Sequence, residues 1–150
     1  MGKRRKAREA AIQYHFWRDL HHGAGPEKIE EFWDFCPVKP KAREFAQPLI
    51  EGMVAHLPEI DARIRKYCEN YEFHRISPVD RNVLRLAIYE MLYRDDIPPV
   101  VSINEAIELA KTFGGGESGR FVNGILDRVR KDLTRPAREA VSSAQKERQD

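Results

Sequence analysis

The sequence predicts an all-helical protein, and three observations support this fold class. Apolar residues recur at helical spacing in several segments, strand-like alternation of apolar and polar residues is absent, and prolines and glycines separate the helical segments. The chain has 150 residues, of which 41% are hydrophobic and 33% are charged. This composition is typical of a globular domain with a polar surface. A chain of this length buries roughly 68–70% of its unfolded surface, so we expect it to fold without disulfides or a metal.

The first helix is expected from about Arg4 to His22, because glycines and a proline follow it. One flank of this helix begins basic and becomes apolar further along, and we expect the bundle to leave that flank uncovered. The flank consists of Arg4, Arg5, Arg8, Ile12 and Phe16. The apolar residues beside it share an arc of about 120° and form the expected core face. They are Ala7, Ala10, Ala11, Tyr14 and Trp17.

Three further helices are expected in the first half of the chain. The second, short and acidic, runs from about residue 27 to 35. A break at residues 36–40 precedes the third, from about 41 to 56. The Leu57-Pro58 step separates the third helix from the fourth, because the residue before a proline is disfavoured in a helix. The fourth helix is expected to end near residue 70.

The fifth helix has the clearest start signal. Ser77 is suited to the N-cap, Pro78 to the first helical position, and Asp80 to the first turn, where a carboxylate is favoured by the helix dipole. Residues 95–99 include two acidic residues and two prolines, which predict the end of this helix.

Two more helices complete the predicted bundle. Ser102 and Glu105 fit a capping box at the start of the sixth helix, and three glycines at 114–116 end it. Ser118 is expected to cap the seventh helix, which runs to about residue 133. We expect one domain over residues 1–133.

The residues after this domain form a different kind of segment. Residues 134–150 are polar and offer almost nothing to bury. Such a composition predicts a flexible tail.

Positive charge is concentrated at the start of the chain. Five of the 26 lysines and arginines lie within residues 1–8, and without them 21 cations face 24 anions. The asymmetry suggests a terminal arm that contacts a polyanion, with a solvated helix start as the alternative. The five cations of this arm are Lys3, Arg4, Arg5, Lys6 and Arg8.

The sequence lacks the motifs of the common enzyme and membrane classes. Its five histidines form no HExxH motif, the 114–116 glycines lack the lysine and serine of a phosphate-binding loop, and no GxSxG elbow occurs. No apolar run approaches the ~18 residues of a spanning helix, and the N-terminus lacks the apolar region of a signal peptide. Cys36 and Cys68 lack CxxC spacing and are expected to be reduced thiols. We therefore expect a cytoplasmic protein that is not an enzyme, with no catalytic residue, metal or cofactor.

Two ordered strings of residues resemble a known family. VSINEAIELAKTFG at 101–114, followed by SGRFVNGILD at 118–127, is similar to the signature of the NusB transcription antitermination family. Val79-Asp80-Arg81 and residues 84–91 resemble the helix before that signature. Residues 5–13, with Gln13 at their end, resemble the family's basic first helix. The resemblance covers about residues 3–133 and is strongest over 79–127.

The resemblance implies a fold and a set of partners. The fold is two packed three-helix-type subdomains, at about 1–57 and 58–133 here, with a seventh helix. Members of the family bind the boxA element of nascent RNA together with NusE, a small-subunit ribosomal protein. We therefore expect boxA-like single-stranded RNA of rRNA operons, NusE and the transcription elongation complex as partners, no membrane, and a possible homodimer.

The resemblance also assigns roles to residues. Phe121 would stack on a base, Arg120 would meet a phosphate, Ser118 would bond a polar base edge, and Glu117 would accept from a base amino group. At helical spacing, Phe121 can instead be a core residue. The full set expected at RNA is Lys3, Arg4, Arg5, Lys6, Arg8, Gln13, Glu117, Ser118, Arg120 and Phe121.

The surface for the protein partner is expected on the exposed flank of the first helix. Ile12 and Phe16 are placed there by the helical wheel and the resemblance, and Asp80 matches an acidic position of the family. Two departures affect details of binding: Gly119 stands where relatives can carry a longer side chain, and Phe16 stands where a tyrosine is common.

Two other functions fit the same sequence features. The chain resembles the RNA-binding domain of an rRNA methyltransferase, which would require a further catalytic domain. It could also be a helical self-associating protein without an RNA role. RNA binding at near-physiological salt separates this last alternative from an antitermination factor.

Overall fold

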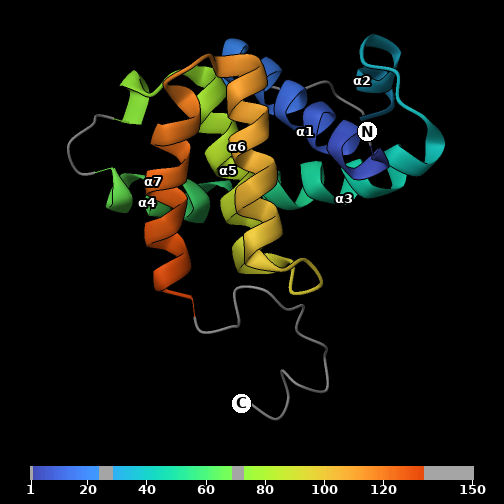
Figure 1. Cartoon of the computed structure of the whole chain (residues 1–150). Helices are drawn as coiled ribbons and strands as arrows, with labels where there is room; N and C mark the ends of the chain where they lie inside the picture. Colours follow the sequence, from blue (N-terminus) through green and yellow to red (C-terminus); the bar gives the residue numbers. More distant parts are fainter. Residues whose placement is uncertain (1, 24–28, 69–72, 134–150) are drawn as a thin grey trace.

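The protein is all-helical, as the sequence predicts (Figure 1). The computed structural model describes residues 2–23, 29–68 and 73–133, and within them it contains no strand. The expected tail, 134–150, lies outside the described residues. The helices are α1 (Lys3–Leu20), α2 (Ile29–Phe35), α3 (Pro40–Ala55), α4 (Leu57–Tyr67), α5 (Pro78–Tyr93), α6 (Pro99–Gly114) and α7 (Ser118–Lys131), with a short 3₁₀ helix at Phe73–Arg75.

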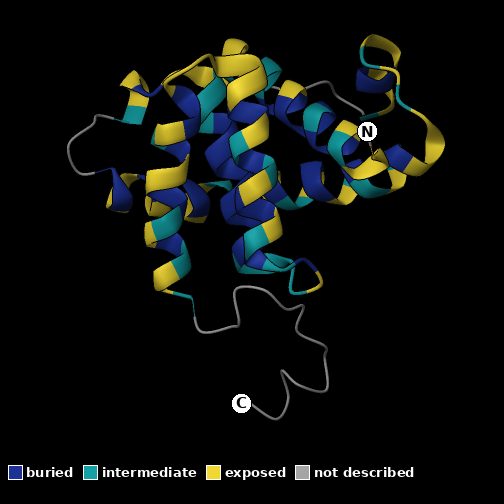
Figure 2. Ribbon diagram, viewed as in Figure 1, coloured by how far each residue is buried: buried dark blue, intermediate teal, exposed yellow. Residues whose placement is uncertain are grey.

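Helix α5 lies at the centre of the bundle. It packs against α1, α3, α4, α6 and α7, and every residue from Asn82 to Met91 is buried (Figure 2). A helix buried on all sides must be apolar or have its polar groups paired. One hydrophobic cluster joins residues from α1 through α7. Because α5 contacts helices from both halves of the chain, the expected division near residue 57 stays a prediction.

The start of α5 confirms the capping prediction. The backbone N–H of Asp80 donates to Ser77 Oγ at 3.1 Å, and Pro78 occupies the first helical position. The cap satisfies one of the amides that a helix start leaves without an intrahelical acceptor.

The predicted starts of α6 and α7 need correction. Helix α6 begins at Pro99, three residues before the predicted capping serine, because a proline needs no amide partner in the first turn. Ser102 is therefore inside α6, buried, and its Oγ donates to Glu90 Oε1 at 2.7 Å. Ser118 is the first residue of α7 and Glu117 occupies the cap position, with no side-chain cap bond there.

An ion-pair network holds the end of α1 to α4 and α5. Arg85 of α5 donates to Asp61 of α4 at 2.8 and 3.0 Å and to Asp19 of α1 at 2.9 and 3.1 Å. The Asp19 carboxylate also accepts from Arg81 and Asn82. These bonds hold the pKa of Asp19 below its usual value despite partial burial, which acts in the opposite direction. The network fixes the direction of α1 across the bundle.

Candidate functional site

The basic arm of the sequence is the first two turns of α1. Lys3, Arg4 and Lys6 are exposed there. Arg5 is half-buried, and its Nε donates to Glu105 Oε2 of α6 at 2.7 Å. This hydrogen bond raises the pKa of Arg5. The arm is thus a helix packed on the bundle, with three solvent-facing cations and one that is paired at its edge.

Arg8 does not belong to the exposed set, and its expected phosphate contact is corrected. Its side chain is 2% exposed, and Nε and Nη2 donate to the two carboxylate oxygens of Glu90 at 2.8 and 2.9 Å. A guanidinium in this position cannot reach a phosphate without breaking a buried ion pair. The neighbouring residue Ala7 is also fully buried, so part of the arm belongs to the packed interior of the bundle.

Arg4 is exposed but not isolated. Its guanidinium lies 4.8 Å from the centroid of the Phe45 ring, and those of Arg8 and Arg94 lie 5.3 and 5.2 Å from the same ring. Cations placed near an aromatic ring are attracted by its electron density. Phe45 of α3 therefore contributes to the orientation of the arm.

The loop between α6 and α7 carries the residues that the resemblance assigned to RNA. Gly115 has a φ of 96°, a conformation that L side chains rarely adopt. Glu117 and Arg120 are exposed beside it, and Phe121 is partly buried against the hydrophobic cluster. Phe121 thus combines the two interpretations of the sequence: part of the side chain packs and part remains accessible.

Ser118 and Gly119 are less accessible than expected. Ser118 is 7% exposed, and its hydroxyl lies where a Cβ on Gly114 would clash with it. Its hydroxyl faces the end of α6, and the expected contact of Ser118 with a base edge stays a prediction. At Gly119, a Cβ would lie 3.1 Å from Lys111 Cγ. Lys111 covers the space that a longer side chain would need.

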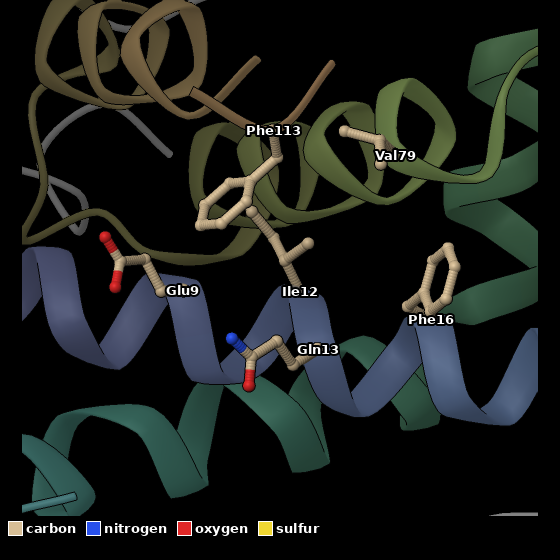
Figure 3. Close-up of a pocket in the computed structure, with 6 residues that line it drawn as sticks. All are labelled: Glu9, Ile12, Gln13, Phe16, Val79 and Phe113. Carbon is tan, nitrogen blue, oxygen red and sulfur yellow. The ribbon is translucent and has the colours of Figure 1, made fainter. Parts of the chain in front are cut away.

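An apolar groove of about 240 Å³ lies between α1 and the adjoining ends of α5 and α6 (Figure 3). Both apolar residues expected at the partner surface line it. Phe16 is half-buried, but Ile12, which was expected on an uncovered flank, is only 5% exposed because the bundle covers it. Val79 and Phe113 form the opposite side, and Figure 3 shows the Phe113 ring above Ile12. The groove is completed by Glu9 and Gln13.

Three groove residues were not expected from the sequence, namely Glu9, Val79 and Phe113. Val79 and Phe113 follow helical spacing, and spacing alone assigns them to the core. The signal that could have distinguished Phe113 is its place in the last turn of α6, directly before the glycines, where a ring can remain 44% exposed.

Gln13 lies in the groove and Asp80 lies beside it. Gln13 was expected at RNA, but it lines the groove, and its Oε1 accepts from Cys36 Sγ at 2.9 Å. Asp80 was expected at the partner surface. Its Oδ1 is buried, 3.1 Å from the position that a Cβ on Gly114 would take. Asp80 therefore lies under the α6–α7 loop, one residue from the groove.

The fold and the site together define the class of the protein: a small helical protein whose first helix carries a basic surface and an apolar groove side by side. This arrangement suits simultaneous contact with a polyanion and a protein. The family model described as "NusB family" matches residues 5–131. The chain belongs to the NusB family.

Individual relatives agree with this assignment. The chain is 45% identical over 140 residues to the transcription antitermination protein NusB of Myxococcus xanthus, covering 91% of this chain and all of the relative. The solved structure of T. maritima NusB is 41% identical with a TM-score of 0.77, covering 88% and 93% of the two chains. A crystal structure of antitermination factors NusB and NusE in complex with dsRNA matches at 29% identity and a TM-score of 0.77, covering 87% and 98%.

Among the described residues, two kinds of feature are absent. None of the described helices is long and apolar enough to cross a membrane. Among the same residues, no group of three or more His, Cys, Asp or Glu side chains is placed to hold a metal ion.

Proposed function

We propose that the protein is a transcription antitermination factor that binds boxA-like single-stranded RNA of nascent rRNA transcripts together with NusE. One observation carries the proposal: α1 presents exposed cations in its first two turns and lines the apolar groove from Glu9 onward. The names of the relatives support it, as does the likeness to a structure of NusB and NusE with RNA. In this role the protein acts as an adaptor in the cytoplasm and catalyses no reaction.

The RNA side of this adaptor uses two elements. Lys3, Arg4 and Lys6 neutralise phosphates, which is the main source of affinity for single strands. The α6–α7 loop contributes Arg120 for a further phosphate and the accessible part of Phe121 for stacking.

The protein side uses the groove. Ile12, Phe16, Val79 and Phe113 offer apolar contact to side chains of NusE, and Glu9 and Gln13 provide polar groups beside them. An apolar centre with polar groups near it is the usual anatomy of a protein interface.

The test is a titration of the protein with boxA-like single-stranded RNA, with and without NusE. We expect specific binding near physiological salt and tighter binding with NusE present. If RNA binding is lost at 150 mM salt both with and without NusE, the result contradicts the proposal and favours a self-associating protein. The methyltransferase alternative is less well supported. The chain matches relatives named transcription antitermination protein NusB over nearly their whole length.

A further inference from the structure

A second group of exposed cations lies at the far end of α7 from the α6–α7 loop. Arg63 and Lys66 of α4 and Arg128 and Lys131 of α7 are all exposed. The two helices meet there, since Arg128 Nη1 donates to the carbonyl of Tyr67 at 3.0 Å and Lys66 Nζ lies 3.9 Å from Asp132 Oδ2. We call these four cations the α4–α7 surface.

The α4–α7 surface has an excess of positive charge. Counting Arg130 beside it, five cations lie near the three carboxylates of Glu59, Asp127 and Asp132. Outside residues 1–8 the chain as a whole has more anions than cations. The local excess of positive charge at the α4–α7 surface is therefore opposite in sign to the net charge of that part of the chain. Two of the carboxylates also accept hydrogen bonds from tyrosines, Glu59 from Tyr93 and Asp132 from Tyr67. Their negative charge is therefore shared among several donors.

A hollow of about 580 Å³ adjoins Arg63 and Lys66. Leu92 and Tyr93 of α5 form part of its lining. The Tyr93 ring is stacked on His56, with centroids 3.9 Å apart and planes at 16°. Burial and the bond to Glu59 raise the pKa of Tyr93 to about 12, so its hydroxyl remains a donor at neutral pH. A concave surface with cations and a fixed aromatic ring has the features of a single-strand binding site.

We propose that the α4–α7 surface binds the phosphate backbone of RNA flanking the element held by the arm and loop. The inference rests on the proposed function. Helix α7 connects the two places: its 14 residues span about 20 Å at 1.5 Å per residue, and a strand leaving Phe121 can follow it. Once the first element is bound, the flanking strand stays close to these cations, which favours a weak second contact.

The test compares two RNAs, a short boxA-like strand and the same strand extended by about 15 unstructured nucleotides at each end, a length near the upper site size of a single-strand binding domain. The variant is Arg63→Gln combined with Lys66→Gln. The matched control is Arg65→Gln, an exposed cation of the same helix that faces Phe73, 4.3 Å from its ring. Thermal unfolding of each variant checks that the fold is kept.

We expect wild type to bind the extended strand more tightly than the short one. Two phosphate contacts add about 1.4 to the salt slope, so the advantage of the extension falls roughly 7-fold between 50 and 200 mM salt. The double variant loses this advantage and binds the short strand as wild type does, whereas Arg65→Gln keeps both properties.

Three results overturn the inference: no gain for wild type from the extension, a double variant that keeps this gain, or equal loss in the double variant and the control. A short strand that fails to bind wild type contradicts the proposed function instead, so the two failures are distinguishable.

Discussion

Arg8 and Glu90 form a two-point ion pair inside the protein, with side chains 2% and 1% exposed. The pair joins the basic end of α1 to the central helix α5, and Ser102 of α6 donates a third bond to the same carboxylate. Three helices therefore meet at Glu90. Arg8, which the sequence alone suggests for RNA binding, instead helps to hold α1, with its exposed cations, on the bundle.

Arg8→Ala should lower the free energy of unfolding by about 3–5 kcal/mol, because it removes the buried guanidinium that pairs with the Glu90 carboxylate. Lys3→Ala, at an exposed position of the same helix, should change it by less than ~0.5 kcal/mol. Urea unfolding of both variants measures the difference. Equal midpoints would contradict the structural role of Arg8.

The exposed cations can be removed without touching this pair. Lys3→Gln, Arg4→Gln and Lys6→Gln together should flatten the salt slope for single-stranded RNA by about 2, at ~0.7 per lost phosphate contact. Deletion of residues 1–8 is a poorer test, because it also removes Arg8 and the buried Ala7. Titrations at several salt concentrations give the slope, and an unchanged slope would contradict the arm's contact with RNA.

Phe121→Ala should weaken RNA binding roughly 5- to 150-fold, since a stacked base contributes about 1–3 kcal/mol. The cost in stability should stay below ~2 kcal/mol because the ring is only partly buried. Val122→Ala, at the fully buried neighbour, should show the reverse pattern. Thermal unfolding and RNA titration of both variants measure the two effects. Lost stability with intact affinity would make Phe121 a core residue.

The groove predicts which residues anchor the protein partner. Phe16→Ala and Phe113→Ala should each weaken NusE binding by ~1 kcal/mol or more if the rings are buried in the complex, with RNA binding by the protein alone unchanged. Leu20→Ala is the control, because Leu20 is exposed on the same helix outside the groove. Calorimetric titration of each variant with NusE provides the comparison. A control that loses as much affinity as Phe16→Ala would place NusE elsewhere on α1.

We expect the free energy of unfolding to decrease in mild acid because His15 is buried in its neutral form. Burial, then Arg18 and Arg85, lower the pKa of His15 to about 3. Because the unfolded histidine binds a proton below about pH 6.5 and the folded one does not, the stability difference is lost as pH falls from 6.5 toward 3. The slope is at most about 1.4 kcal/mol per pH unit. Urea unfolding at pH 7 and pH 5 should show a loss of up to ~2 kcal/mol that is absent in His15→Leu.

The sequence was sufficient for the helical fold and for the cap at Ser77, because both depend on residues a few positions apart. It was not sufficient for Arg8, whose partner Glu90 is 82 residues away. An arginine that is free and one that is paired in the interior have the same local sequence. Val79 and Phe113 show the same limit for apolar residues, since helical spacing identifies the inward side of a helix but not whether a neighbouring helix covers it.

Helix α1 has a further consequence for how the two ligands are chosen. Lys6 and Phe16 lie ten residues apart on one rigid helix, about 15 Å along its axis, and the groove begins between them at Glu9, whose Oε2 lies 3.5 Å from Lys6 Nζ. Under the proposed function, α1 therefore holds its two ligands in one fixed arrangement, and it favours an RNA and a protein that can contact each other where the basic surface meets the groove. Pairs with a different arrangement would have to give up one of the two contacts, so selectivity would arise from geometry that neither ligand alone can test.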